Sequence, residues 1–247
     1  TKSTDHARLD VTAPTNKGVG LKIEITNDNG GLVGPINTSN DGYINAAEKP
    51  ADNFLTSHIS VNSTAVVGDK IVISADNDGT ALSPMTRVLS AEDIANGFDV
   101  KFAIPAEGKL QNVTANYVDS AGNAATDAKA KDFIKIDTLA MNFNSAGLNS
   151  TLSNGINHLG SATFKHAASE AGKYELKVGT TLVNEGNFDG KQSVDVTPTT
   201  SASGTVQLDF WDMAGNHSRY MLTDSKGPTT YNVYFNDRDY GSTHFIV

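Results

Sequence analysis

Apolar and polar residues alternate at a period of two along most of the chain, and this pattern constrains the fold more than any other feature. Successive side chains of a β-strand point to opposite faces, so a strand with one buried face shows this alternation. Val100, Phe102 and Ile104, for example, fall on one face. The alternating segments are 21–26, 98–104, 110–118, 173–178, 205–211 and 230–235. Because only segment 90–97 favours a helical turn, we expect an all-β chain of about fourteen short strands.

A repeated motif divides the chain into two domains. The sequences VDSAGNAA around Asp119 and WDMAGNHS around Asp212 share the pattern Asp-x-Ala-Gly-Asn and lie 93 residues apart. This spacing is about the length of one immunoglobulin-like sandwich. The Asp side chain can accept backbone N–H groups across a type I turn, and the Gly can adopt a positive φ. We therefore interpret both motifs first as hairpin turns.

A second pair of similar sequences marks the domain boundaries. The sequences RLDVTAPT and KIDTLAMN place Asp10 and Asp137 at the end of a strand, before a short linker. We predict a tail over residues 1–15, a first β-sandwich over 16–137 and a second over 138–247. These would be two tandem immunoglobulin-like β-sandwich domains in an elongated arrangement.

The segment NTSNDGYINAAE, residues 37–48, has the ligand spacing of a twelve-residue calcium loop. Such a loop places oxygen ligands at positions 1, 3, 5, 7, 9 and 12 and a Gly at position 6. The residues at positions 1, 3, 5, 6, 7, 9 and 12 are Asn37, Ser39, Asp41, Gly42, Tyr43 through its carbonyl, Asn45 and Glu48. Asn37 is neutral where a carboxylate is usual, and Asp28 could supply the missing charge. We expect Ca²⁺ to bind, more weakly than at a sensor site because few ligands are charged.

The alternative for this loop is a turn that binds no ion. Asn, Asp and Gly are common in turns for backbone reasons alone, and Asn-Asp-Gly is a strong turn signal. Gly42 at position 6 together with Glu48 at position 12 favours the calcium interpretation.

Composition excludes several classes of site and partner. The chain has no cysteine, which excludes disulfides, thiolate metal sites and a cysteine nucleophile. Its net charge of −9 disfavours nucleic acid and anionic membrane surfaces and favours cations. No segment approaches 18 consecutive apolar residues, and the first residues lack a signal-peptide core. We therefore expect no direct membrane insertion, and we expect the chain to be a piece of a longer protein.

No sequence motif indicates catalysis. The six histidines lie far apart, and no nucleophile elbow or phosphate-binding glycine loop occurs. Acidic pairs such as Glu92 with Asp93 could serve a glycosidase, but an aromatic content of 7% leaves little for a substrate cleft. We expect a protein without enzymatic activity.

Together these motifs resemble the tandem bacterial immunoglobulin-like repeats of giant, type I-secreted RTX-type surface adhesins. The resemblance is carried by LDVTAPT and IDTLA as joints, VDSAGNAA and WDMAGN as hairpins, and NDGYINAAE as the calcium loop. It implies calcium-stabilised extender domains that project a binding region from the bacterial cell surface for adhesion or biofilm formation. The implied partners are neighbouring repeats of the same chain. The resemblance also implies Asp10 and Asp137 as calcium ligands at the joints, with Asp119 and Asp212 as ligands from the second side.

The second domain departs from this pattern at its end. Residues 227–247 lack the joint expected before another repeat and gather aromatic residues such as Tyr231 and Phe245. Two alternatives therefore stand beside the extender. One is a module near the adhesin tip that binds a host or surface ligand, or associates with itself, through the C-terminal domain. The other is a non-catalytic module of a secreted polysaccharide-degrading enzyme.

Overall fold

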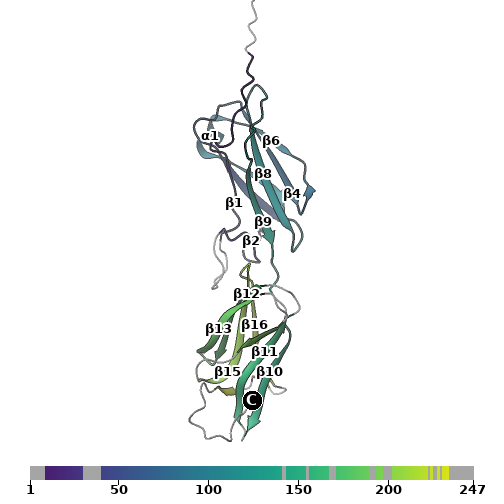
Figure 1. The fold of residues 1–247 in the computed structure, drawn as a ribbon, viewed down its shortest axis with the longest axis vertical. Coiled ribbons are helices and arrows are strands. Elements are labelled where there is room, and N and C mark those ends of the chain that lie inside the picture. The colour runs from purple at the N-terminus through teal and green to yellow at the C-terminus, as the bar shows by residue number, and fades with distance from the viewer. Residues whose placement is uncertain are drawn as a thin grey trace, which may run out of the picture. The chain divides into compact units, whose positions relative to one another are not determined.

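The chain folds into β-strands in two units, and the expectation of an all-β protein is confirmed (Figure 1). The computed structural model describes residues 9–29, 40–140, 143–153, 156–166, 171–189, 193–196, 202–221, 223–224, 227–228 and 230–233. Unit 1 comprises Thr1–Asn29, Gly42–Ile44 and Glu48–Asp137, and unit 2 comprises Gly30–Asp41, Asn45–Ala47 and Thr138–Val247. The predicted calcium loop therefore contributes residues to both units.

Unit 1 consists of two sheets. The first has the strand order β1 (Lys22–Ile25), β3 (Phe54–Ser60) and β7 (Phe98–Ala103). The second has the order β2 (Tyr43–Ile44), β9 (Ala130–Ile136), β8 (Leu110–Val118), β4 (Lys70–Asn77) and β5 (Thr80–Ala81), with β6 (Met85–Val88) also paired to β4. All of these pairs are antiparallel except β2 with β9. This arrangement is that of a β-sandwich.

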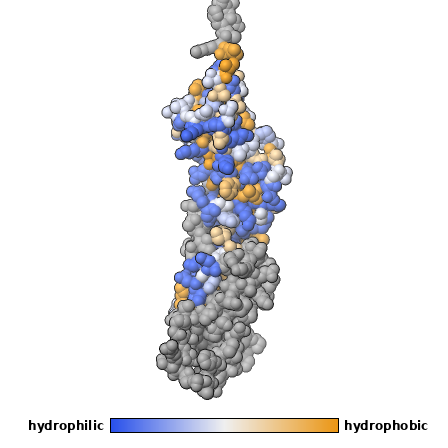
Figure 2. Space-filling view, viewed as in Figure 1, coloured by the Kyte–Doolittle hydropathy of each residue, from blue (hydrophilic) through white to orange (hydrophobic). Residues whose placement is uncertain are grey.

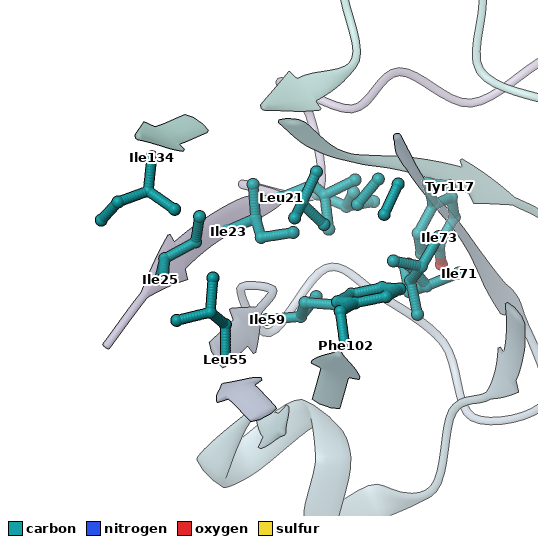
Figure 3. Packing of buried hydrophobic residues seen from close by; sticks show 14 of the residues in the cluster. Leu21, Ile23, Ile25, Leu55, Ile59, Ile71, Ile73, Phe102, Tyr117 and Ile134 are labelled. Carbon is teal, nitrogen blue, oxygen red and sulfur yellow. The ribbon is translucent and has the colours of Figure 1, made fainter. Parts of the chain in front are cut away.

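The core of unit 1 lies between the two sheets and uses the residues that alternation predicts. On β8, Val113, Ala115 and Tyr117 are buried, at exposures of 0%, 0% and 2%. Figure 3 shows other buried side chains of the same cluster, which come from other strands and from the segment before β1, among them Leu21, Ile23, Ile25, Leu55, Ile59, Ile71, Ile73, Phe102 and Ile134. Burying each such aliphatic side chain contributes about 1.5–3 kcal/mol, so this cluster is the main source of stability in unit 1.

One helix is present in the described part of the chain, where a helical turn is expected. Helix α1 runs from Ala91 to Asn96, and Ser90 and Asp93 form a capping box at its N-terminus. Gly97, at a φ of 73°, ends it. The cap satisfies backbone N–H groups that a six-residue helix cannot satisfy internally.

Unit 2 has two groups of strands joined by one long strand, β15 (Ala202–Asp212). Its remaining strands are β10 (Phe143–Ser153), β11 (Ile156–His166), β12 (Ala171–Val178), β13 (Thr181–Asp189), β14 (Ser193–Val196), β16 (His217–Met221), β17 (Thr223–Asp224), β18 (Gly227–Pro228) and β19 (Thr230–Val233). The first part of β15 pairs with β19, and the rest pairs with β12 and β16. Val206, Leu208 and Phe210 of β15 are buried, as the sequence alternation predicts.

The described surface of unit 1 is largely hydrophilic, with hydrophobic atoms gathered where the described chain begins (Figure 2). Leu9 and Val11, which lie there, are 86% and 73% exposed. No helix among the described residues is long and apolar enough to cross a membrane.

Candidate calcium loop and repeated hairpins

The turn that the calcium-loop motif predicts at Gly42 is present. Gly42 has a φ of +87°, a conformation that glycine adopts without strain. After it, the chain pairs with β9: the Gly42 carbonyl accepts the Lys135 N–H at 2.9 Å, and the Ile44 carbonyl accepts the Asp137 N–H at 3.0 Å. Asn37 and Ser39, the first two predicted ligands, lie outside the described residues.

Two buried carboxylates of unit 1 accept backbone N–H groups, one at the Gly42 turn and one in the segment after β1. Asp28 is 7% exposed, and its Oδ2 accepts the Gly42 N–H at 2.8 Å. Glu48 is 5% exposed, and its Oε1 accepts the Asn29 N–H at 3.0 Å. Asp28, predicted from sequence to add charge to the loop, thus contacts it directly. Carboxylates are rarely this buried without compensating partners, so both groups fix the loop to the end of β1.

Tyr43 lies on β2, and Asp137 directly follows β9, the strand that pairs with β2. Asp137 is 6% exposed. Burial raises the pKa of its carboxyl group, while the Lys135 ammonium, 3.5 Å away, acts in the opposite direction and Glu107 adds to the increase. The same ammonium lies 5.6 Å from the centre of the Tyr43 ring, a cation–π distance.

Asn45 belongs to unit 2 and is fully buried, at 0% exposure. Its Nδ2 donates to the Ala214 carbonyl at 3.1 Å, and its Oδ1 accepts the Ala47 N–H at 2.9 Å. The next residue, Ala46, donates its N–H to Asn216 Oδ1 at 3.1 Å. The side-chain oxygen predicted as a calcium ligand thus also holds a local turn, and this segment covers the second Asp-x-Ala-Gly-Asn motif.

The two repeated motifs form hairpins with the same internal hydrogen bonds. In unit 1, Asp119 Oδ1 accepts the Asn123 N–H at 2.7 Å and Oδ2 accepts the Asn123 side-chain amide at 2.9 Å. In unit 2, Asp212 accepts the same two groups of Asn216 at 2.8 and 3.0 Å. The backbone bonds also agree, since each Asp N–H donates to the Asn carbonyl at 3.0 and 3.1 Å.

The glycines of these hairpins, Gly122 and Gly215, have φ values of 95° and 82°. The interpretation of both motifs as turns is confirmed, and both carboxylates serve their own hairpin. The hydrogen bonds from Asn123 lower the pKa of Asp119 below its ordinary value.

Asp10 does not share the environment of Asp137. Its side chain is exposed, and its Oδ1 accepts the Thr12 N–H at 3.0 Å. Its carbonyl, rather than its carboxylate, accepts the Asn123 side-chain amide at 3.1 Å. Asp10 therefore adjoins the Asp119 hairpin.

The described residues fit calcium in donor type but do not form a carboxylate cluster. No three His, Cys, Asp or Glu side chains in the described part of the chain are grouped so that they could hold a metal ion. Asp28, Asp41 and Glu48 therefore do not make a three-carboxylate site. Ca²⁺ takes six to eight oxygen ligands, which can be neutral. A calcium ion here would therefore be bound by fewer than three carboxylates, together with neutral oxygens such as the Tyr43 carbonyl.

Two buried aspartates were not predicted from the sequence. Asp69, 4% exposed, accepts hydrogen bonds from the Tyr117 hydroxyl and, at 2.7 Å, from the Ser120 N–H, which ties the loop before β4 to the first hairpin. Asp209, 1% exposed, accepts hydrogen bonds from His217 and Arg219, both at 2.8 Å.

Opposing effects set the pKa of Asp209. Burial alone would raise it, but the hydrogen bonds from Arg219, Gln207 and His217 hold it below the ordinary value. Asp209 occupies a polar position in the alternation of β15, where the sequence predicts an exposed side chain, so no sequence signal indicates its burial.

The aromatic residues that suggested a binding surface are largely outside the described structure. Tyr231 lies in β19. Tyr234, Phe235, Tyr240 and Phe245 lie beyond the described residues.

Comparison with known proteins assigns no family. No protein-family model matches the chain, and no curated protein is similar to it in sequence. Among solved structures, the fibronectin(III)-like modules of CbhA from Clostridium thermocellum align with 74% of this chain and 85% of theirs, at 11% identity and a TM-score of 0.34. The FN1–FN3 domains of chicken CNTN1 align with 74% of this chain and 62% of theirs, at 9% identity and a TM-score of 0.34. Similarities of this size carry no conclusion about function.

Proposed function

We propose that the chain is a pair of calcium-stabilised extender domains from a large secreted bacterial adhesin. In this proposal the domains are immunoglobulin-like repeats at the bacterial cell surface, they project a binding region for adhesion or biofilm formation, and they carry no catalytic activity. Neighbouring repeats of the same protein are their partners.

The observation that carries the proposal is the repeated hairpin. Two units of one chain use the motif Asp-x-Ala-Gly-Asn with matching hydrogen bonds at Asp119 and Asp212. Matching local structure in successive units is typical of proteins built from repeats, which act by their number and spacing. An extender is such a protein.

The oxygen atoms of the loop support the calcium part of this proposal. Asp28 and Glu48 are buried in unit 1 on either side of the Gly42 turn, and Ca²⁺ prefers carboxylate and carbonyl oxygens. When bound, the ion would supply positive charge that opposes the repulsion between these carboxylates. Binding to the folded state alone would also stabilise that state, so a chain could remain loosely folded without calcium and fold when it meets calcium outside the cell.

The test measures calcium binding and hydrodynamic behaviour together. Isothermal titration with Ca²⁺ should give saturable heat, and sedimentation velocity should show a changed frictional ratio on addition of a chelator. Mg²⁺ at the same concentration is the control ion, because it prefers six ligands in a rigid octahedral geometry. A chain that gives no heat with Ca²⁺ and sediments identically with and without chelator would contradict the proposal.

A further inference from the structure

One strand of unit 1 carries a stripe of basic residues on its outer face. Lys131, Phe133 and Lys135 occupy every second position of β9, and Lys129, directly before the strand, continues the spacing. Successive side chains of a strand point to opposite faces, and the buried Ile134 lies on the core face. The stripe therefore lies on the outer face of the sheet in which β9, β8 and β4 are neighbours (Figure 1). We call these four residues the basic stripe.

The side chains of the basic stripe are accessible to a ligand. Phe133 is 58% exposed, which is unusual for an aromatic residue within a strand. Lys129 and Lys131 are exposed, and neither forms an ion pair with any residue that the structure describes. Lys135 is partly engaged, because its ammonium lies 3.5 Å from Asp137. The stripe thus presents an exposed ring and two ammonium groups that no described carboxylate neutralises.

Hydrogen-bonding side chains border the stripe on the next two strands. On β8, Asn112 is directly opposite Phe133, and the next outward residue, Thr114, is opposite Lys131. Asp76 of β4 is opposite Asn112 in turn, and its Oδ1 accepts the Asn112 side-chain amide at 3.0 Å. Among the described residues, no donor bonds to the Asn112 side-chain oxygen or to Asp76 Oδ2. Both oxygens can accept hydrogen bonds from hydroxyl groups of a ligand.

This face of the sheet is basic although the chain as a whole is acidic. The charged side chains that point outward from the sheet, together with the lysine directly before β9, are Lys70, Lys129, Lys131, Lys135 and Asp76. The net charge of the whole chain is −9. Charges more than about 8 Å away are largely screened at physiological ionic strength. A ligand on this face is therefore governed by the local positive charge.

These groups together indicate the chemistry of the ligand. The ammonium groups favour an anion, and the exposed ring favours a ligand with an apolar face. Phe133 is bordered by Lys131, Lys135 and Asn112 and not by other large exposed apolar side chains, which disfavours a protein partner. The Asp76 carboxylate would repel the phosphates of a nucleic acid but can accept hydroxyl groups. A sugar chain with carboxylate groups has all three properties: negative charge, apolar ring faces and hydroxyl donors.

We propose that the basic stripe binds a linear acidic polysaccharide whose sugar units carry carboxylates. A sugar ring stacks on Phe133, and carboxylates pair with Lys129 and Lys131. Hydroxyl groups of the same chain donate to Asn112 and Asp76. The stripe spans about 20 Å, which suits an extended polymer better than a single sugar. This inference goes beyond the proposed function, because an extender that only sets distance needs no ligand of its own, and it depends neither on calcium nor on a neighbouring repeat.

The first experiment measures binding of oligogalacturonate, a linear chain of uronic acid units, to the whole chain by isothermal titration. EDTA is present throughout, which excludes bridging by Ca²⁺, so a negative result leaves the calcium proposal untouched. We expect saturable binding at low salt that weakens as added salt screens the lysines. The methyl-esterified oligomer has the same rings without the charges and should bind at least about fivefold more weakly. Absence of binding of oligogalacturonate at low salt would overturn the proposal.

Two double variants locate the charge that the ligand meets. Lys129→Gln with Lys131→Gln should weaken binding of oligogalacturonate about fivefold, because two exposed ion pairs are lost. Lys22→Gln with Lys101→Gln removes the same charge from exposed positions on the sheet formed by β1, β3 and β7. This control should change binding by less than about twofold, since its lysines lie on the other sheet. Equal losses in the two double variants would overturn the proposal, because net charge alone would then explain binding.

Two aromatic variants test the stacking contact. Phe133→Ala should weaken binding about fivefold, whereas Phe54→Ala, at a residue that is 43% exposed on the other sheet, should leave it unchanged. Urea midpoints of both variants show that each remains folded. Equal affinities of Phe133→Ala and the original chain would overturn the stacking contact and with it the proposed site.

Single-stranded oligothymidylate is the competing anion, because it offers charge and stacking bases but few hydroxyl groups. We expect it to bind more weakly than oligogalacturonate of similar length. Tighter binding of this DNA, with the same loss in the Lys129→Gln and Lys131→Gln double variant, would overturn the polysaccharide proposal in favour of a nucleic acid.

Discussion

Asp212 accepts two hydrogen bonds from Asn216, one from the backbone N–H at 2.8 Å and one from the side-chain amide at 3.0 Å, with only 1% of Asp212 exposed. Asp212→Ala should therefore leave two buried donors without an acceptor. We expect the free energy of unfolding to fall by about 2 kcal/mol or more. Trp211, the single tryptophan, adjoins this hairpin, so its fluorescence during urea unfolding reports the change.

Two variants test whether burial sets this cost. Met213→Ala, at a residue that is 45% exposed, should change the free energy by no more than about 0.5 kcal/mol. Asp119→Ala breaks the matching bonds in a half-buried hairpin and should cost less than Asp212→Ala, because water can replace the lost acceptor. Equal losses for the two aspartates would contradict the role given to burial.

The Asp93 carboxylate should make unit 1 sensitive to acid. Hydrogen bonds from Arg87 lower its pKa to about 2; burial opposes them, and Ser90 adds to the decrease. Because the folded pKa lies below the ordinary value near 3.9, this stabilisation is complete above about pH 4 and is lost as the pH falls through 2. Asp93→Asn should remove this part of the pH dependence.

The measurement is the urea midpoint of unit 1 by circular dichroism from pH 7 to pH 2. The original chain should lose stability between pH 4 and pH 2 faster than Asp93→Asn, while Glu92→Gln, at an exposed neighbour, should follow the original chain. Parallel curves for the original chain and Asp93→Asn would show that the Arg87 contact contributes nothing.

Tyr117 should make unit 1 sensitive to alkali. Burial, followed by the hydrogen bond to Asp69, raises its pKa to about 12. Since the folded pKa lies above the ordinary value near 10, this stabilisation is complete below about pH 10 and is lost as the pH rises through 12. Tyr117→Phe should lose about 1–3 kcal/mol at pH 7 and show a flatter decline from pH 10 to pH 12 in urea unfolding. An unchanged alkaline decline in the variant would exclude Tyr117 as its source.

The sequence predicts the strands and hairpins because their signals are local. Burial of one face of a strand requires apolar residues at every second position, which is visible at Val113, Ala115 and Tyr117. The Asp-x-Ala-Gly-Asn hairpin is closed by residues within five positions of one another, and α1 by Ser90 and Asp93. In each case the interacting groups appear together in the sequence.

The contacts that sequence analysis missed join distant segments. Asn45 bonds to a carbonyl 169 residues away, and Asp69 bonds to a hydroxyl 48 residues away. Such pairs depend on strand register and loop path, which no local pattern fixes. The candidate calcium loop lies between these cases. Its Gly42 turn is local and is predicted from the sequence, whereas its hydrogen bond to Asp28 forms only when the segment after β1 meets the loop.

The most direct test of calcium stabilisation is the melting temperature in Ca²⁺ and in chelator for the original chain, Glu48→Ala and the exposed control Glu24→Ala. We expect Ca²⁺ to raise the melting temperature of the original chain and of Glu24→Ala by about 5–10 °C. A ligand that binds only the folded state stabilises it by this much when the ligand concentration is well above Kd. In Glu48→Ala this calcium-dependent difference should disappear, whatever the variant loses in chelator. An original chain that melts at the same temperature in both conditions would contradict calcium stabilisation.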